Sequence, residues 1–221
     1  YNLGSPMSAK HRIVPSGTVT SPGGFLAGAT CAGIKTGGED QLDLGILYSE
    51  CPCVASGVFT ANKVRAAPVF LCQERISNRS ARAVVVSSGC ANACTGEQGL
   101  ADSREMAALA AGKLGLSPDD VLVASTGMIG IPLPMERVRR GVGHVNLSRD
   151  GGHKLSRAIM TTDSFPKEMA LSISLGDKKA TVGGVAKGAG MIHPDMATML
   201  CFLATDAALE PHFAEASLRR A

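Results

Sequence analysis

The residues of this chain best suited to chemistry are a lysine, a glycine-rich turn and a threonine near its end. Lys187 opens the stretch Lys187-Gly-Ala-Gly, and Thr198 stands just before the apolar run 199–204. A threonine hydroxyl at the mouth of a strand can act as a nucleophile, and the turn before it supplies backbone N–H groups and a cation. If the bond between Ala197 and Thr198 were cut, Thr198 would carry an α-amine, a base near neutral pH beside its own hydroxyl. The alternative is an ordinary buried strand that begins with a β-branched residue.

A second candidate lies where the apolar run 121–124 ends at Ser125-Thr126-Gly127. A strand that ends in Thr-Gly presents a hydroxyl and a backbone N–H that no bulky side chain obstructs. Such a pair suits an oxyanion hole, although the residues alone are equally those of a routine turn.

The pattern along the rest of the chain predicts strands joined by short polar turns, together with amphipathic helices. The predicted strands cover residues 25–34, 42–48, 54–60, 82–86, 121–124, 170–175, 181–186 and 199–204. The predicted helices cover residues 102–114, 134–145, 154–160 and 210–220. We therefore expect a compact α/β protein, with a loose N-terminal arm over residues 1–20.

Composition narrows the class of protein. The net charge of +3 is too small to favour nucleic acid as a partner, and the chain has no apolar run of about 18 residues that could span a membrane. The N-terminus lacks the apolar core of a signal peptide. Seven cysteines form an odd set that fits a reducing, cytoplasmic interior. The spacings Cys51-x-Cys53 and Cys90-x-x-x-Cys94 do not make a paired zinc pattern, so we expect no metal.

Several short blocks resemble one family, in that family's order. Lys187-Gly-Ala-Gly-Met, Met196-Ala-Thr-Met-Leu and Thr205-Asp-Ala resemble the cleavage-site signature of the ornithine acetyltransferases, the self-processing acyltransferases of arginine biosynthesis. The other matching blocks are Gly57-Val-Phe-Thr, Ala66-Ala-Pro, Ser88-Gly-Cys-Ala-Asn-Ala-Cys-Thr-Gly, Ser125-Thr-Gly-Met-Ile-Gly-Ile-Pro and Met160-Thr-Thr-Asp. The similarity runs from about Gly17 to the last residue, and several blocks in register are far more specific than any one.

The resemblance implies an α+β sandwich of mixed sheets flanked by helices, and a ping-pong acyl transfer after self-cleavage between Ala197 and Thr198. N2-acetylornithine gives its acetyl group to Thr198, ornithine leaves, and glutamate attacks the acetyl-Thr ester. The protein would thus be a glutamate N-acetyltransferase without a cofactor. Acetyl-CoA enters only as a possible second donor.

The resemblance also assigns the other site residues. Thr126 and Gly127 correspond to the oxyanion pair, and Lys187 contacts the substrate. Of the neighbours Thr161 and Thr162, we choose Thr161 as the second substrate contact. Turn chemistry with the adjacent Asp163 is the alternative for both threonines.

The implied organisation is an N-terminal chain over residues 21–197 and the start of a second chain over residues 198–221. The two cleavage products stay together, as a dimer of such pairs. Two departures stand near the site: Cys90 replaces a usual Asn, and Asp195 adds a negative charge close to the scissile bond. The alternatives are an amidase or aminopeptidase on the same self-cleaving fold, with water as acceptor, and an uncleaved binding module without catalysis.

Overall fold

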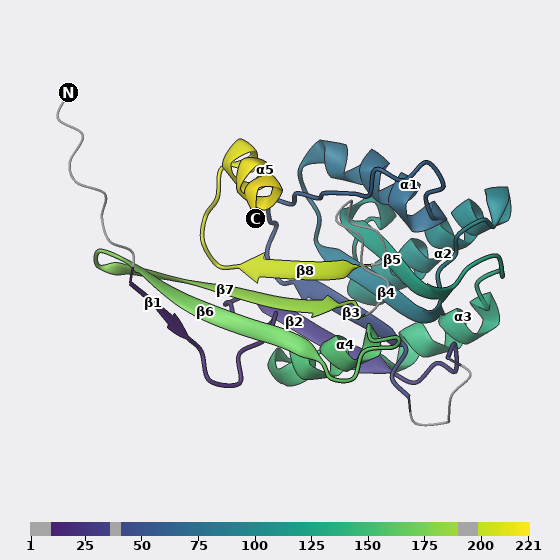
Figure 1. Cartoon of the computed structure of the whole chain (residues 1–221), viewed down its shortest axis with the longest axis horizontal. Coiled ribbons are helices and arrows are strands. Elements are labelled where there is room, and N and C mark those ends of the chain that lie inside the picture. Colours follow the sequence, from purple (N-terminus) through teal and green to yellow (C-terminus); the bar gives the residue numbers. More distant parts are fainter. Residues whose placement is uncertain (1–9, 36–40, 190–198) are drawn as a thin grey trace.

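The computed structural model describes residues 10–35, 41–189 and 199–221, which form two stacked four-stranded sheets with helices (Figure 1). The inner sheet has the order β2-β3-β4-β5 and the outer sheet the order β1-β6-β7-β8. The inner strands are β2 (Phe25–Thr30), β3 (Leu44–Ser49), β4 (Ala83–Cys90) and β5 (Val121–Met128). The outer strands are β1 (Lys10–Ile13), β6 (Lys167–Leu175), β7 (Lys178–Lys187) and β8 (Leu200–Thr205). All described strand pairs are antiparallel except β4 with β5, which is parallel.

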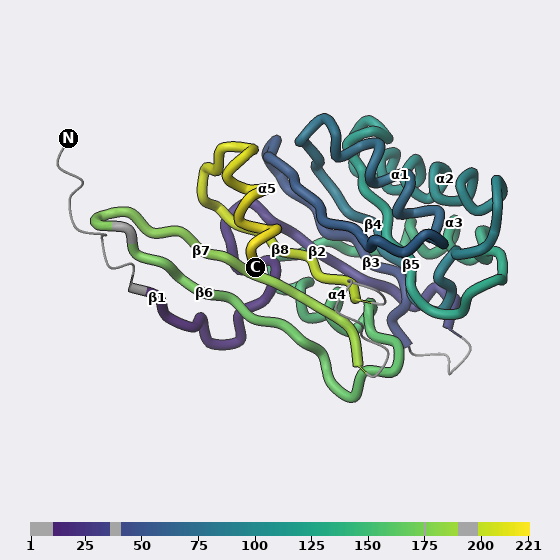
Figure 2. The backbone as a smooth tube through the Cα atoms, turned by 45° about the horizontal axis from the view of Figure 1, so that its top comes forward, coloured from purple at the N-terminus to yellow at the C-terminus, as the bar shows by residue number. Residues whose placement is uncertain are grey.

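Three helices cover one face of the inner sheet, and the outer sheet lies on its other face (Figure 2). The three covering helices are α1 (Ala67–Arg75), α2 (Gly96–Leu114) and α3 (Met135–His144). Two further helices are α4 (Gly152–Ala158) and α5 (Pro211–Arg220). Short 3-10 turns occupy Ile76–Asn78, Pro118–Asp120 and Arg149–Gly151. The fourth helix, α4, contacts β2 and β3 as well as β6 and β7, so it packs against both sheets.

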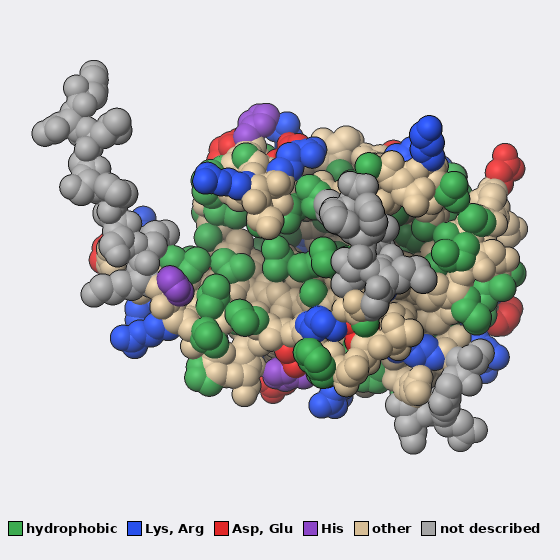
Figure 3. Space-filling model, in the orientation of Figure 1, with side chains coloured by type: hydrophobic (Ala, Val, Ile, Leu, Met, Phe, Trp, Pro, Cys, Tyr) green, Lys and Arg blue, Asp and Glu red, His purple; other side chains and the backbone are tan. Residues whose placement is uncertain are grey.

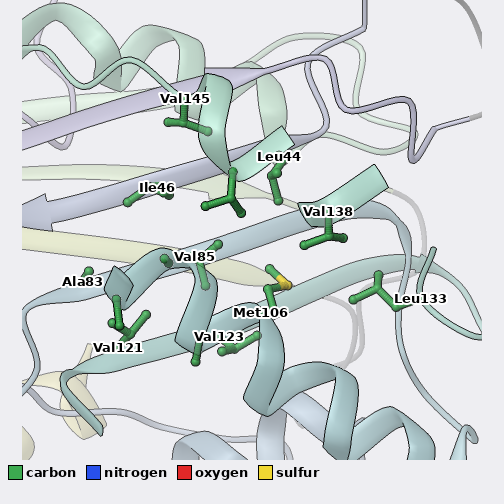
Figure 4. Close-up of a cluster of buried hydrophobic side chains, with 14 of the residues drawn as sticks. Leu44, Ile46, Ala83, Val85, Met106, Val121, Val123, Leu133, Val138 and Val145 are labelled. Carbon is green, nitrogen blue, oxygen red and sulfur yellow. The ribbon is translucent and has the colours of Figure 1, made fainter. Parts of the chain in front are cut away.

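Alternating side chains of the inner strands build two separate cores. Val85 of β4 and Val121 and Val123 of β5 face the helices, where they pack with Met106 of α2 and Val138 of α3 (Figure 4). The neighbouring residues on β4 and β5 point the other way, because successive side chains of a strand alternate between faces. They join a second core between the sheets, whose buried members are Val19, Ala27, Leu47, Val86, Ala124, Leu155, Ile159, Val185 and Ala204.

Most predicted elements are confirmed, and the exceptions have local causes. The segment 54–60 is not a strand: Val54 forms only an isolated bridge with Ser80, and no neighbouring strand among the described residues pairs with the rest. Helix α1 was not predicted, although Pro68 stands in its first turn, where the missing N–H costs nothing. Helix α2 begins at Gly96, one and a half turns before the predicted start at 102.

The prediction of a loose arm over residues 1–20 needs correction for its second half; residues 1–9 lie outside the described residues. Strand β1 pairs with β6, with His11 opposite Ile173. Thr18 and Val19 are buried, since the following segment passes between the sheets. Polar and glycine-rich composition therefore misidentified an integral edge strand as a tail.

One buried carboxylate holds the loop between β2 and β3. Asp43, only 1% exposed, accepts hydrogen bonds from the backbone N–H groups of Ala32 (2.7 Å), Ile34 (2.5 Å) and Lys35 (3.0 Å). Replacing Asp43 with alanine would leave these buried donors without their acceptor, which costs about 1–3 kcal/mol per group. We expect the free energy of unfolding, measured by urea denaturation, to fall by roughly 3 kcal/mol or more. The exposed Asp150→Ala variant serves as control, and an equal loss in both variants would contradict this role for Asp43.

Candidate active site

The carboxyl ends of the parallel pair β4 and β5 approach each other unusually closely. Gly89 and Gly127 lie opposite each other in register, both with positive φ (112° and 133°), and the pairing becomes irregular at Cys90. A Cβ on Gly127 would lie 2.3 Å from the carbonyl carbon of Gly89, so only glycine fits. This bulged, glycine-lined strand end brings backbone groups close to whatever lies beside Gly127.

The position of Thr126 within β5 decides which way its side chain faces. Ala124 lies in the core between the sheets, and Thr126 is two residues further along the same strand face. It is buried, opposite Ser88 of β4. Ser125 faces the helices instead, and its hydroxyl lies 3.0 Å from that of Ser87. The predicted oxyanion pair therefore stands at one end of the layer between the sheets.

Lys187 approaches the same layer from the outer sheet. It ends β7, two residues after the core residue Val185, and pairs in register with Leu200 of β8. Lys187 is only 3% exposed. Burial lowers the pKa of its ammonium group from the ordinary value, while the negative charge of Asp163 opposes that shift. Lysines are rarely buried in this way, so burial marks Lys187 as a candidate functional residue.

A series of contacts connects the strand end at Thr126 with Lys35. Ser88, the register partner of Thr126, donates from its hydroxyl to the carbonyl of Ala158 at 2.5 Å. The ammonium of Lys35 lies 3.4 Å from the same carbonyl oxygen. The negative charge of Asp163 raises the pKa of both Lys35 and Lys187, against the effect of burial.

Asp163 connects three backbone segments at this end. One carboxylate oxygen accepts from the ammonium of Lys167 (2.6 Å) and from the N–H of Gly188 (2.8 Å), and the other accepts from the N–H of Thr161 (3.1 Å). Burial by itself would raise the pKa of Asp163, but these hydrogen bonds outweigh it and lower the pKa to about 2. The carboxylate is therefore ionised near neutral pH.

Lys35 is a second, partly buried lysine near Asp163. Its ammonium donates to the carbonyl of Leu42 at 2.8 Å. Burial lowers its pKa, and the charges of Asp43 and Asp163 oppose that shift. Lys35, Ser88 and Asp163 were not among the predicted site residues. The sequence pointed to Ser88 and Asp163 only through the family-like blocks that contain them, and it gave no such indication for Lys35.

The other predicted residues fall into two groups. Ala197 and Thr198, the predicted cleavage site, lie outside the described residues, as does Asp195. Thr161 and Thr162 are described and exposed, next to Asp163, and the N–H of Thr161 is part of the turn described above. The predicted substrate contact by Thr161 thus stays a prediction.

The cysteines and acidic groups offer no further chemistry in the described part of the chain. Cys90, in the position of the usual Asn, is buried, and burial raises the pKa of its thiol. All seven cysteines lie in the described ranges, and none of them forms a disulfide bond there. Within those ranges no three His, Cys, Asp or Glu side chains gather closely enough to hold a metal ion. Nor is any described helix both long and apolar enough for a bilayer.

Comparison with known proteins decides the family. The sequence model of the ArgJ family matches residues 26–221, which is most of the chain. The chain belongs to the ArgJ family. An arginine biosynthesis bifunctional protein ArgJ from Dehalococcoides mccartyi is 48% identical over 215 residues, covering 97% of this chain and 53% of that protein. An ArgJ protein from Symbiobacterium thermophilum is 50% identical, over 93% of this chain and 52% of its own length.

Solved structures of the ArgJ family share this fold. The crystal structure of an ArgJ protein from Bacillus halodurans has a TM-score of 0.80 and 39% identity, and covers 87% of this chain and 100% of its own. The ornithine acetyltransferase of Mycobacterium tuberculosis, solved in complex with ornithine, has a TM-score of 0.77 and 40% identity, with 88% and 100% covered. The predicted sandwich of mixed sheets flanked by helices is therefore confirmed. The chain spans about half the length of the curated ArgJ relatives it matches.

Proposed function

We propose that this protein is the acetyl-transferring part of a glutamate N-acetyltransferase. It moves the acetyl group of N2-acetylornithine to glutamate through an ester on Thr198. The observation that carries the proposal is that Thr126, at the end of β5, and Lys187, at the end of β7, are both buried, on strands that pack into the layer between the two sheets. This arrangement occurs in a member of the ArgJ family, one of whose solved proteins is an ornithine acetyltransferase bound to ornithine.

Activation begins with an N-to-O shift, in which the Thr198 hydroxyl attacks the carbonyl carbon of Ala197. The peptide C–N bond breaks and an ester forms, which water then hydrolyses. Ala197 becomes a C-terminal carboxylate, and Thr198 keeps a free α-amine that can act as its base. The small side chain of Ala197 leaves its carbonyl open to attack.

Catalysis uses the same hydroxyl twice. The α-amine of Thr198 takes the hydroxyl proton as the oxygen attacks the acetyl carbonyl of acetylornithine. The negative oxygen of the tetrahedral intermediate accepts hydrogen bonds from the N–H of Gly127 and the hydroxyl of Thr126. The C–N bond to ornithine then breaks, and the leaving amine takes the proton. In the second half the α-amine of glutamate attacks the ester, acetylglutamate leaves, and the Thr198 hydroxyl regains its proton. Lys187 holds a substrate carboxylate throughout, beside Thr161.

The lengths of the relatives support cleavage of the family's chains into two pieces. Curated ArgJ proteins are covered over only 53% and 52% of their length. The solved chains are covered completely, by 87% and 88% of this chain. The solved chains are thus about half as long as the curated proteins, as a cut near the middle would make them.

The outer sheet offers a surface for the second piece. Met169 of β6 and Leu203 of β8 lie on either side of Gly184 of β7 on the outward face, 54% and 55% exposed. Ile13 of β1 is also exposed and lies opposite Leu171, two residues along β6 from Met169. Hydrophobic side chains gather over these strands in the face shown in Figure 3. We propose that the C-terminal cleavage product covers this face and that two such pairs form a dimer in the cytoplasm. Hydrogen exchange of the full-length protein should then protect β6 and β8 beyond their protection in residues 1–221 alone.

Incubation of the full-length protein with N2-acetylornithine and isotopically labelled glutamate tests the function. We expect labelled acetylglutamate and one equivalent of ornithine. Release of free acetate without labelled acetylglutamate would identify an amidase instead, and absence of both products would favour a binding module. A parallel assay with acetyl-CoA and glutamate shows whether acetyl-CoA is a second donor.

Replacing Lys187 with methionine should raise KM for acetylornithine roughly 10- to 100-fold, because one charged hydrogen bond to the substrate carboxylate is lost. In the wild type, KM should rise as the pH climbs through the lowered pKa of Lys187, since only the ammonium form binds the carboxylate. That rise should be missing in Lys187→Met. Lys179→Met, exposed near the opposite end of β7, is the control, and equal effects of both variants would refute the assignment.

A further inference from the structure

We propose that Asp163 is a positioning residue of the acetyl-transfer site: its carboxylate fixes the backbone on either side of the substrate and holds Lys187 in place. The inference rests on the proposed function and names a residue that takes no part in bond making. It begins from geometry. One carboxylate without any exposed surface accepts hydrogen bonds from the loop after α4, from the start of β6 and from the end of β7.

The bond to Gly188 is the one that reaches Lys187. The N–H of Gly188 belongs to the same peptide plane as the carbonyl of Lys187, so anchoring that N–H fixes the orientation of the Lys187 backbone. Gly188 has a φ of +149°, which glycine adopts without strain and which lets the chain turn toward Asp163 as β7 ends. The backbone that carries the Lys187 side chain is therefore held in one orientation, although it lies at the end of a strand.

The bond to Thr161 fixes the opposite side. Its N–H donates to the second carboxylate oxygen, which sets the turn that carries Thr161 and Thr162. One rigid group thus sets the separation of the two predicted substrate contacts, Thr161 and Lys187. The salt bridge to Lys167, which lies opposite Ala186 in register, ties the carboxylate to the sheet itself.

Asp163 also sets the charge of its surroundings. Lys187 is buried and Lys35 is partly buried, and burial lowers the pKa of each ammonium group. The carboxylate of Asp163 opposes the shift at both sites, so it keeps the cations charged where a substrate carboxylate would bind. Asp163 is itself unsuited to proton transfer, since a carboxyl with a pKa of about 2 is a poor base near neutral pH.

An exposed carboxylate just after β8 provides a control. Asp206 accepts hydrogen bonds from the N–H groups of Thr181 (2.6 Å) and Gly23 (3.1 Å), near the end of β7 remote from Lys187. Like Asp163, it joins separate backbone segments through its two oxygens. It is remote in register from the proposed site, so its loss should affect stability alone.

The experiment compares Asp163→Asn and Asp206→Asn in the full-length protein. For Asp163→Asn we expect kcat for acetyl transfer to fall on the order of 100-fold, the effect of misplacing reacting groups by about 1 Å. We also expect the titration of Lys187, followed by 13C NMR of the methylated lysines and assigned with Lys187→Met, to move to lower pH. Asp206→Asn should change kcat less than about threefold once corrected for the folded fraction, and should leave the Lys187 titration in place.

Asp163→Glu separates position from charge and serves if the asparagine variant fails to fold. It should lower kcat while keeping the Lys187 titration near that of the wild type. The proposal is overturned if folded Asp163→Asn keeps its kcat within the range of the control, or if the Lys187 titration does not move. A wild type that transfers no acetyl group would refute the proposed function instead, and the Lys187 titration would still decide whether Asp163 controls this cation.

Discussion

The full-length Thr198→Ala variant should lose both the cut between residues 197 and 198 and acetyl transfer. Alanine has no hydroxyl to attack the carbonyl of Ala197, so intact mass measurement should find a single uncut chain. Without the cut there is neither a free α-amine nor an ester, and the rate of acetylglutamate formation should fall at least about 10⁴-fold, as expected for removal of a nucleophile.

Thr198→Ser is the matched control because it keeps the hydroxyl and loses only a methyl group. It should still yield a fragment that begins at residue 198, more slowly than the wild type. If Thr198→Ala produced acetylglutamate at the wild-type rate, the nucleophile would have to be another residue.

Replacing Thr126 with valine should have the second-largest effect. Valine keeps the shape of the buried side chain and removes only the hydroxyl that stabilises the oxyanion. We expect kcat to fall on the order of 100-fold or more with little change in KM, because the interaction is made in the transition state. The measurement is steady-state kinetics with acetylornithine and glutamate.

Ser125→Ala is its control, one residue away on the same strand. The Ser125 hydroxyl pairs with Ser87 on the helix-covered face, so its loss should lower stability without lowering kcat. A smaller drop in kcat for Thr126→Val than for Ser125→Ala would contradict the assignment of the oxyanion pair. Gly127→Ala is less informative, since its Cβ would collide with Gly89 and disturb both strands.

Local sequence pattern predicted most of the fold because the elements concerned have strong periodicity. The hairpin of β6 and β7 follows from two alternating segments around Gly176, and α2 ends as predicted at Gly115, which adopts the left-handed conformation. The failures occurred where partners matter more than pattern. Segment 54–60 has strand-forming residues but no strand beside it, and β1 has polar residues but pairs with β6.

The site divides in the same way. Thr126, Gly127 and Lys187 were identified because each stands at a strand end in a recognised block. Lys35 and Asp163 were missed as site residues, since a Lys before a glycine pair and an Asp after two threonines are typical of exposed turns. Their partners are distant in the sequence: Lys35 reaches the carbonyl of Ala158 at the end of α4, and Asp163 accepts from the N–H of Gly188 after β7.

The sequence was sufficient to predict the family, most of the strands and helices, and the residue types that acyl transfer needs. These follow from short-range spacing, which survives in the linear chain. The close approach of the ends of β4 and β5, the burial of Lys187 and the hydrogen bonds that join three segments at Asp163 required the folded protein. The physical reason is that burial and charge depend on neighbours distant in sequence: a lysine whose pKa falls and a carboxylate whose pKa drops to about 2 acquire those properties only when the two sheets stack.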